Sequence, residues 1–272
     1  MISIDKLSYI SKLRKVNPME KFIFAILTML LSIYLNNILI SIIVIILMGF
    51  ITVYKGKIPF SSYLVLMLIP LGFLIVGVIT IAINIGDYSS HTLFGFSIFN
   101  IRFGCTQESI IESAKVLFRS LAAVSCLYFL SLSTPIVELL SVLKKLKVPK
   151  LFVELMSLIY RFIFIFLETV NLIYISQDSR LGYSNLKTGY NSLGKLIGSL
   201  FLSSYKRSQD MYNALESRCY EGDINVIENN YKISYVNLVM ILFLEVFLIF
   251  LAINENTCIG VMGGVIWRKN IL

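Results

Sequence analysis

Two short stretches of the sequence, 38 residues apart, carry the same types of side chain in the same order. Residues 176–180 read Ser-Gln-Asp-Ser-Arg and residues 214–218 read Ala-Leu-Glu-Ser-Arg. Each copy therefore has a small residue, then any residue, then an acidic residue, then Ser and Arg. The small residue precedes the arginine by four positions, which predicts that both lie on one helix face. A small side chain lets another backbone approach, and the arginine offers a planar fork of donors for a carboxylate or a helix-end carbonyl. This chemistry is recognition of another protein.

The alternative is that Arg180 and Arg218 are ordinary helix-end arginines, each contributing well under about 1 kcal/mol by complementing the helix dipole. For a single arginine we would favour that interpretation. Two arginines in one five-residue context, both closing a long predicted helix, favour docking into two matched sites. The predicted docking residues are Ser176, Asp178, Ser179, Arg180, Ala214, Glu216, Ser217, Arg218 and Cys219.

A second motif resembles a phosphate-binding loop, and its context argues against that role. Gly189–Lys195 fits the first seven places of the loop, but Leu196 stands where Ser or Thr should hold Mg²⁺. No apolar strand precedes the motif, so we do not expect the chain to bind ATP.

Metal and catalytic sites are not indicated either. His91 is the single histidine, with Asp87 as its nearest carboxylate, and the four cysteines are scattered without a CxxC pair. One histidine without a second donor makes a poor metal site. No Ser-His-Asp set, HExxH or close carboxylate pair occurs, so we expect no cofactor, no metal and no enzyme active site.

The elements that must position the two arginines belong to a membrane protein. The chain is 57% hydrophobic and 15% charged, with a mean hydropathy of +0.81, and several apolar runs can cross about 30 Å of hydrocarbon. We expect an all-α polytopic fold of about five transmembrane helices plus a cytoplasmic coupling domain of three helices. The predicted spans are Met19–Leu35, Ile38–Tyr54, Ser62–Ile85, Glu108–Ser133 and Tyr235–Ile253. The predicted regions are a transmembrane part at 1–134, the coupling domain at 135–232, and the last span with a short tail at 233–272.

Within the coupling domain, Ser133, Thr134 and Pro135 form a helix-start signal. Helices are predicted over 135–147, 149–180 and 185–218. Before the fourth span, residues 86–107 are polar and aromatic, which predicts an extramembrane loop with a short hairpin around 94–96.

The basic residues predict the orientation in the membrane. Residues 1–21, the pair Lys55 and Lys57, and residues 135–232 hold 19 of the 24 lysines and arginines. With four spans before Pro135 and one after Lys232, these regions fall on one side, and the positive-inside rule makes that side cytoplasmic. We therefore expect a multi-pass protein of the bacterial inner membrane with a cytoplasmic N-terminus. The net charge of +8 is therefore less informative than the distribution of the basic residues, and no nucleic-acid partner is expected.

Two groups of charges fall inside predicted spans. Glu245 lies in the last one, where an intramembrane carboxylate is a candidate functional site, although a structural role between helices is favoured. Four charges at i,i+4 spacing in the fourth span must face protein or water: Glu108, Glu112, Lys115 and Arg119.

Several further residues resemble the transmembrane (T) components of energy-coupling factor transporters, and CbiQ of cobalt uptake systems is the most similar type. The resemblance rests on Leu132-Ser133-Thr134-Pro135, Glu138-Leu139-Leu140, Val148-Pro149, Tyr160-Arg161-Phe162 and the two arginine stretches, which match the family's two Ala-Arg-Gly signatures. Ser176 stands where the first signature often has Ala, while Ser217 and Cys219 replace an Ala and a Gly of the second. Each change replaces one small residue with another, so both stretches are still expected to dock.

The resemblance implies a non-catalytic subunit that joins a membrane-embedded substrate-binding (S) component to two cytoplasmic ATPase subunits, with one arginine motif per ATPase. It implies cobalt or nickel as the substrate, and a T component serving vitamin S components is the alternative. A stand-alone secondary transporter with its site around Glu245, Glu112 and Arg119 is less favoured, because the spans show no internal repeat.

Overall fold

The computed structural model describes residues 3–82, 84–85, 92–98, 101–220, 231 and 234–269. Only the backbone is described for 3–4, for 84–105 within these ranges and for 254–269. The chain divides into two compact units. One unit is Leu140–Asn229, and the other is Ile2–Leu139 together with Asn230–Leu272.

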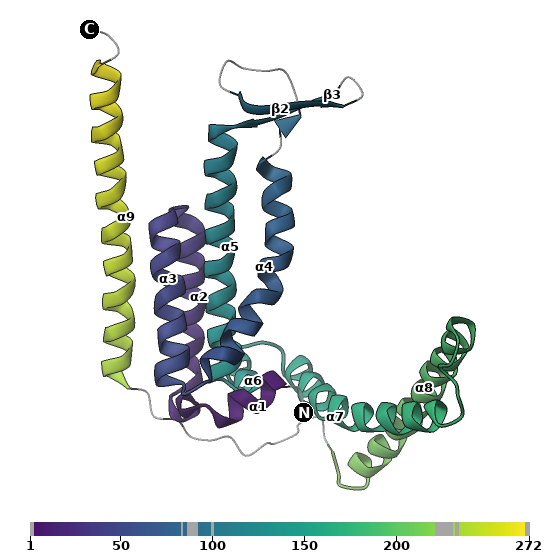
Figure 1. The fold of residues 1–272 in the computed structure, drawn as a ribbon. Coiled ribbons are helices and arrows are strands. Elements are labelled where there is room, and N and C mark those ends of the chain that lie inside the picture. Colours follow the sequence, from purple (N-terminus) through teal and green to yellow (C-terminus); the bar gives the residue numbers. More distant parts are fainter. Residues whose placement is uncertain are drawn as a thin grey trace. The chain divides into compact units, whose positions relative to one another are not determined.

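The second of these units contains the apolar helices, and we call it the span unit. Five helices are long and apolar enough to cross a membrane, which confirms the predicted polytopic all-α class. They run side by side in Figure 1. In chain order they are α2 (Pro18–Leu35), α3 (Ile38–Phe50) with its π-helical continuation η2 (Ile51–Lys55), α4 (Phe60–Ala82), α5 (Gln107–Ser133) and α9 (Tyr235–Lys269).

Asparagines set the helix ends at the start of this unit. The Asn17 side chain accepts from the Met19 amide, with Pro18 in the first position of α2, as expected for an N-terminal cap. Asn36 ends α2 in the left-handed region at φ 46°, and the Asn37 side chain caps α3 through the Leu39 amide. The two asparagines therefore form the tight turn between the first two spans.

Helix α5 lies at the centre of the span unit and contacts α2, α3, α4 and the N-terminal α1 (Ser3–Ile10). The main core combines side chains of α2, α3, α5 and α9: Phe24, Ala25, Ile40, Val44, Met48, Ala122, Cys126, Phe129, Leu130, Leu248 and Ala252. The outward faces are also apolar; Phe73 of α4, for example, is 82% exposed. Apolar side chains on both the inside and the outside are expected where lipid is the solvent.

The structure differs from the sequence prediction at two places in this unit. The loop before α5 contains an antiparallel three-stranded sheet of order β1-β3-β2, formed by β1 (Asn84–Ile85), β2 (Thr92–Ile98) and β3 (Ile101–Thr106). Residues 94–96 lie within β2, so the turn of the predicted hairpin comes later. Helix α9 continues to Lys269, where only a short tail was expected after residue 253.

Two adjacent charges of α2 are buried and tie distant segments together. The Lys21 ammonium donates to the carbonyl oxygens of Ser133 at 2.9 Å and Leu13 at 3.2 Å. The Glu20 carboxylate accepts from the Ser234 amide at 2.7 Å and the Asn237 side chain at 2.9 Å. The start of α2 is thereby bonded to the end of α5, to the 3-10 helix η1 (Lys12–Lys15) and to the start of α9.

The other unit consists mainly of α7 (Lys150–Asp178) and α8 (Leu186–Glu216), and we call it the arginine unit. The short helix α6 (Ile136–Lys145) contains the boundary between the two units. These three helices agree with the three predicted between 135 and 218. Within α7 and α8, Leu196 is the only buried side chain, so the other apolar side chains of the pair are exposed or partly exposed.

Candidate docking site at two matched helix ends

Each of the two arginine stretches closes a long helix, and the two ends have the same hydrogen-bond pattern. At the end of α7, the amides of Arg180 and Gly182 both donate to the Gln177 carbonyl, at 3.1 and 2.9 Å. At the end of α8, the amides of Arg218 and Tyr220 both donate to the Leu215 carbonyl, at 3.0 and 3.1 Å. The two stretches, which lie 38 residues apart, are therefore repeated in structure as well as in sequence.

The serine before each arginine has a matched role. The Ser179 hydroxyl donates to the Ile175 carbonyl and the Ser217 hydroxyl donates to the Asn213 carbonyl, each at 2.8 Å. Each of these carbonyls also accepts from the backbone amide of the same serine, at 3.0 Å, so the hydroxyl adds a second hydrogen bond at the helix end. The predicted serines thus shape the turn that presents the arginine.

The residue after each arginine has a left-handed backbone conformation. Leu181 has φ 56° and Cys219 has φ 55°, a conformation that costs a residue with a side chain roughly 1–2 kcal/mol. Arg180 and Arg218 lie in these turns, two residues beyond the last helical residues Asp178 and Glu216. The expectation that each arginine continues the helix face of its small residue is therefore corrected, because the helix ends before the arginine.

We expect the Cys219→Gly variant to strengthen the second turn, because glycine adopts this φ without steric cost. The gain should be up to about 1 kcal/mol, measured as slower hydrogen exchange of the Arg218 and Tyr220 amides. The Cys219→Val variant should show faster exchange, because a β-branched residue is poorly accommodated at positive φ. Equal exchange rates in the two variants would contradict this account of the turn.

The first arginine turn is anchored to the beginning of α8. The Gln177 side chain donates to the Ser192 carbonyl at 3.1 Å, and the Ser192 hydroxyl donates to the Gly182 carbonyl at 2.9 Å. A Cβ on Gly182 would lie 2.7 Å from the Gln177 carbonyl oxygen and 2.9 Å from the Ser192 hydroxyl, so this close approach requires glycine.

Tyr183 completes the anchor by donating to the Gln177 side-chain oxygen at 2.7 Å. Desolvation, with contributions from Tyr174 and Asp178, raises the pKa of Tyr183 above its ordinary value, so the phenol stays protonated as a donor at neutral pH. No local sequence signal marks Ser192 for this role, which appears only in the tertiary contact.

The second arginine turn is anchored to the opposite end of the helix pair. The Tyr220 hydroxyl donates to the Glu154 carboxylate near the start of α7 at 2.9 Å. Because Ser192 adjoins the first turn and Ser217 begins the second, about 25 residues of α8 separate them, or roughly 40 Å at 1.5 Å per residue. Two sites this far apart cannot enter the same groove of one partner.

All nine predicted docking residues are exposed. Within the described parts of the chain, neither guanidinium group has an ion pair or hydrogen bond. Both arginines therefore present their full set of donors to solvent, while the turns that carry them are fixed by backbone and side-chain bonds.

The motif that resembles a phosphate-binding loop lies inside α8. Its amides from Gly189 onward take part in a helix, so they cannot form the loop that cradles phosphate. Leu196 is buried, in agreement with a structural role for this stretch.

The charges of the alternative transporter site are not brought together. Arg119 donates to the Asn36 side chain at 3.2 Å, Glu112 is exposed, and Glu245 is 6% exposed next to the main core. Neither oxygen of Glu245 has a hydrogen-bond partner in the described part of the span unit. Among the described residues, no group of three or more His, Cys, Asp or Glu could hold a metal ion; His91 lies outside them.

Comparison with known proteins gives consistent matches. Residues 10–232 match the family model for the cobalt transport protein CbiQ. The cobalt transport protein CbiQ of Salmonella typhimurium is 34% identical over 226 residues, covering 83% of this chain and 100% of that protein. A putative fused cobalt transport protein CbiMQ of Methanocorpusculum labreanum is 31% identical over 247 residues, covering 91% of this chain and 41% of that protein. The energy-coupling factor transporter transmembrane protein EcfT of Lactococcus lactis is 33% identical over 126 residues, covering 42% of this chain and 47% of that protein.

Proposed function

Because the chain belongs to the CbiQ cobalt transport family, the T components of energy-coupling factor transporters, we propose that it is the non-catalytic subunit coupling two cytoplasmic ATPase subunits to a substrate-binding S component. The observation that carries this proposal is the pair of matched arginine turns. They are exposed, they lack intrachain partners within the described residues, and roughly 40 Å of helix separates them. One turn for each of two ATPase subunits accounts for all three properties.

Exposed apolar side chains of the arginine unit support further partners. Leu151, Phe152 and Ile159 of α7 and Ile197 and Phe201 of α8 are each at least 57% exposed. Large exposed apolar patches mark protein or membrane contact sites. We assign this surface to the S component and the adjoining lipid, and we take residues 135–232 as the coupling domain.

We propose cobalt as the transported ion, with nickel as the next candidate, because two relatives that match more than four-fifths of this chain are named for cobalt transport. The fused relative contains a second component in the same polypeptide, since this chain matches only 41% of its length. That arrangement supports a second component working beside this chain.

In the proposed mechanism, the arginine turns sit in grooves of the ATPase subunits, where each guanidinium binds a carboxylate or helix-end carbonyls. When the ATPase dimer closes, the two grooves approach each other and carry the ends of α7 and α8 with them. This displacement tilts the bound S component in the membrane. The ATPase chemistry takes place entirely in the partner subunits.

The test of this function is co-purification followed by transport. The tagged chain is expressed with candidate ATPase subunits and the candidate S component from the same genome, and the complex is reconstituted into liposomes. We expect two ATPase subunits per chain and ATP-dependent uptake of cobalt. A chain that purifies alone and still moves cobalt in response to an ion gradient would instead support the secondary transporter.

The proposed orientation places the exposed Cys219 in the cytoplasm. In a Cys105→Ser/Cys126→Ser/Cys258→Ser variant, we expect a membrane-impermeant maleimide to label Cys219 in inverted vesicles at least about tenfold more than in right-side-out vesicles, because the bilayer blocks the charged reagent. The same variant with Cys219→Ser added has no cysteine and measures the background labelling. Preferential labelling of right-side-out vesicles would reverse the orientation.

A further inference from the structure

A small pocket opens in the span unit among η1, α2, η2, α5 and α9. Its volume is about 230 Å³, less than the roughly 300–1,000 Å³ of a pocket for a drug-sized ligand, so it suits a single slender chain. Most of its lining is apolar: Leu13, Val16, Phe24, Ile51, Phe129, Met240, Ile241 and Leu244.

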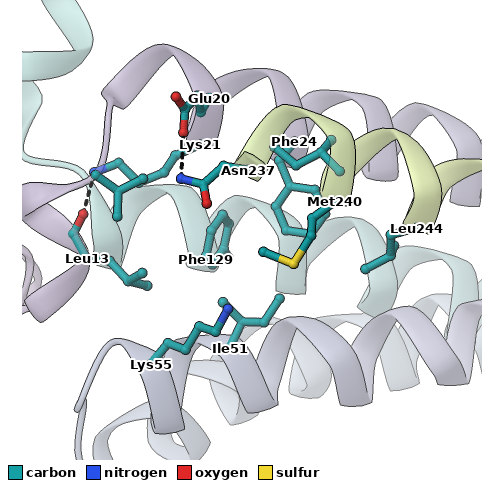
Figure 2. Close-up of a pocket in the computed structure, with 12 residues that line it drawn as sticks. Leu13, Glu20, Lys21, Phe24, Ile51, Lys55, Phe129, Asn237, Met240 and Leu244 are labelled. Carbon is teal, nitrogen blue, oxygen red and sulfur yellow. Dashed lines mark hydrogen bonds between the residues drawn. The ribbon is translucent and has the colours of Figure 1, made fainter. Parts of the chain in front are cut away.

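The polar groups of this pocket lie at defined places in its wall. Glu20 and Lys21 line it but are already bonded to Ser234, Asn237, Leu13 and Ser133. Figure 2 shows the Glu20–Asn237 bond on one side of the pocket and the ammonium group of Lys55 directed toward the pocket from the other. Lys55 is exposed, and no carboxylate pairs with it in the described part of the chain.

Three more lysines lie in or next to the two segments that supply Leu13 and Lys55 to the pocket: Lys12 and Lys15 belong to η1, and Lys57 follows η2 by two residues. The Lys12 amide donates to the Gly56 carbonyl at 3.3 Å, which places the lysine-bearing ends of η1 and η2 side by side. The contact with the Lys57 side chain and repulsion by its charge, followed by desolvation and Lys15, lower the pKa of Lys12. Lys12, Lys15 and Lys57 are all exposed, so like charges are crowded here without a described acidic partner to neutralise them.

The lysines also lie where the spans begin and end. Lys55 is the last residue of the candidate span Ile38–Lys55, and the span Pro18–Leu35 begins just after η1. Basic residues at this level meet the phosphate groups of the bilayer, and each is attracted to anionic lipid. The apolar walls next to them distinguish this place from a purely charged surface.

We propose that the pocket binds an anionic phospholipid, with part of one acyl chain against the apolar walls and the phosphate held by Lys12, Lys55 and Lys57. The acyl chain explains why the lining is apolar, because a free phosphate ion would make no contact with apolar side chains. The phosphate would be a common counter-ion for Lys55, which lines the pocket, and for Lys12 and Lys57, which contact each other beside it in the chain. A bound lipid also connects η1, η2 and α9 at the membrane surface.

The test uses the full chain in detergent micelles, titrated with 1-palmitoyl-2-oleoyl phosphatidylglycerol or with phosphatidylcholine of the same acyl chains. Bound lipid is counted by native mass spectrometry. We expect one phosphatidylglycerol bound at least about tenfold more tightly than phosphatidylcholine. Lys12→Gln/Lys55→Gln/Lys57→Gln should abolish this preference, and Met240→Trp should weaken binding of that lipid by occupying the pocket.

Two matched controls keep the result specific. Lys187→Gln/Lys195→Gln/Lys206→Gln removes the same charge from exposed positions of α8, and Val239→Trp adds the same ring at an exposed position that does not line the pocket. Neither should change the lipid preference. The proposal would be overturned if the two lipids bound equally, or if a control variant lost the preference for phosphatidylglycerol as the lysine variant does. It would also be overturned if millimolar inorganic phosphate displaced the lipid completely.

Discussion

Reversing the charge of both arginines, in an Arg180→Glu/Arg218→Glu variant, should abolish ATP-dependent uptake and the co-purification of ATPase subunits. A buried arginine anchor at an interface contributes about 2 kcal/mol or more. Two such losses weaken the complex by roughly a thousandfold if they are additive, and the new carboxylates add repulsion in an acidic groove. Uptake is measured in liposomes, and subunit stoichiometry is measured by quantitative mass spectrometry of the purified complex.

The structure makes this experiment interpretable because the turns do not depend on the arginine side chains. Their hydrogen bonds come from backbone amides and from Ser179 and Ser217, and neither guanidinium has a partner in the described residues. The double variant should therefore insert and keep its own unfolding midpoint. The Arg218→Glu single variant should retain one docking turn and lose less of the complex than the double variant.

The matched control is Lys187→Glu/Arg207→Glu, which makes the same change in net charge at exposed positions of α8. We expect this control to keep both ATPase subunits and at least about half of the uptake, because isolated surface charges contribute little. If the double arginine variant retained transport, Arg180 and Arg218 would be helix-end arginines and the ATPase contacts would lie elsewhere.

The second large effect is expected at Lys21, as a loss of stability. In Lys21→Met, the Ser133 carbonyl loses the Lys21 donor inside the span unit, while the Leu13 carbonyl keeps the Val16 amide as a partner. A buried carbonyl left unsatisfied costs about 1–3 kcal/mol, so we expect the free energy of unfolding to fall by roughly 2 kcal/mol. Lys21→Glu should fail to give a monodisperse protein, because it places a carboxylate against the negative C-terminal end of α5.

Denaturant titration in detergent micelles measures the Lys21→Met effect. Lys6→Met serves as the control, since Lys6 is an exposed residue of α1 and should change stability by less than about 0.5 kcal/mol. If the two variants had the same stability, the Lys21 ammonium would not contribute to the association of η1, α2 and α5.

Most of the helical framework could be predicted because its signals are local. Apolar runs of span length gave five helices whose starts agree within two residues with those observed, and Asn36 with Asn37 forms the expected turn. The sheet before α5 and the extension of α9 to Lys269 were missed. Strand pairing depends on partners elsewhere in the chain, and polar residues after 253 gave no sign that the helix continues.

The candidate site was predictable only in part for the same reason. The spacing of Arg180 and Arg218 indicated two helix ends, but not the left-handed Leu181 and Cys219 that follow them. Nor could it show that Ser192 and Glu154 anchor the turns, because those contacts form only when α7 and α8 pack.

By itself, the sequence determined the membrane class, the number of spans, the three helices between 135 and 218, and the two repeated arginine stretches. Each of these follows from hydrophobic length or from the residue types at a helix end, which act over a few turns of chain. Only the tertiary structure decided that Lys21 bonds the end of α5, that Glu245 is buried without a described partner, and that Lys55 lines an apolar pocket next to the segment that carries Lys12. Those arrangements depend on which distant segments meet, and packing of α2, α5 and α9 against one another sets that.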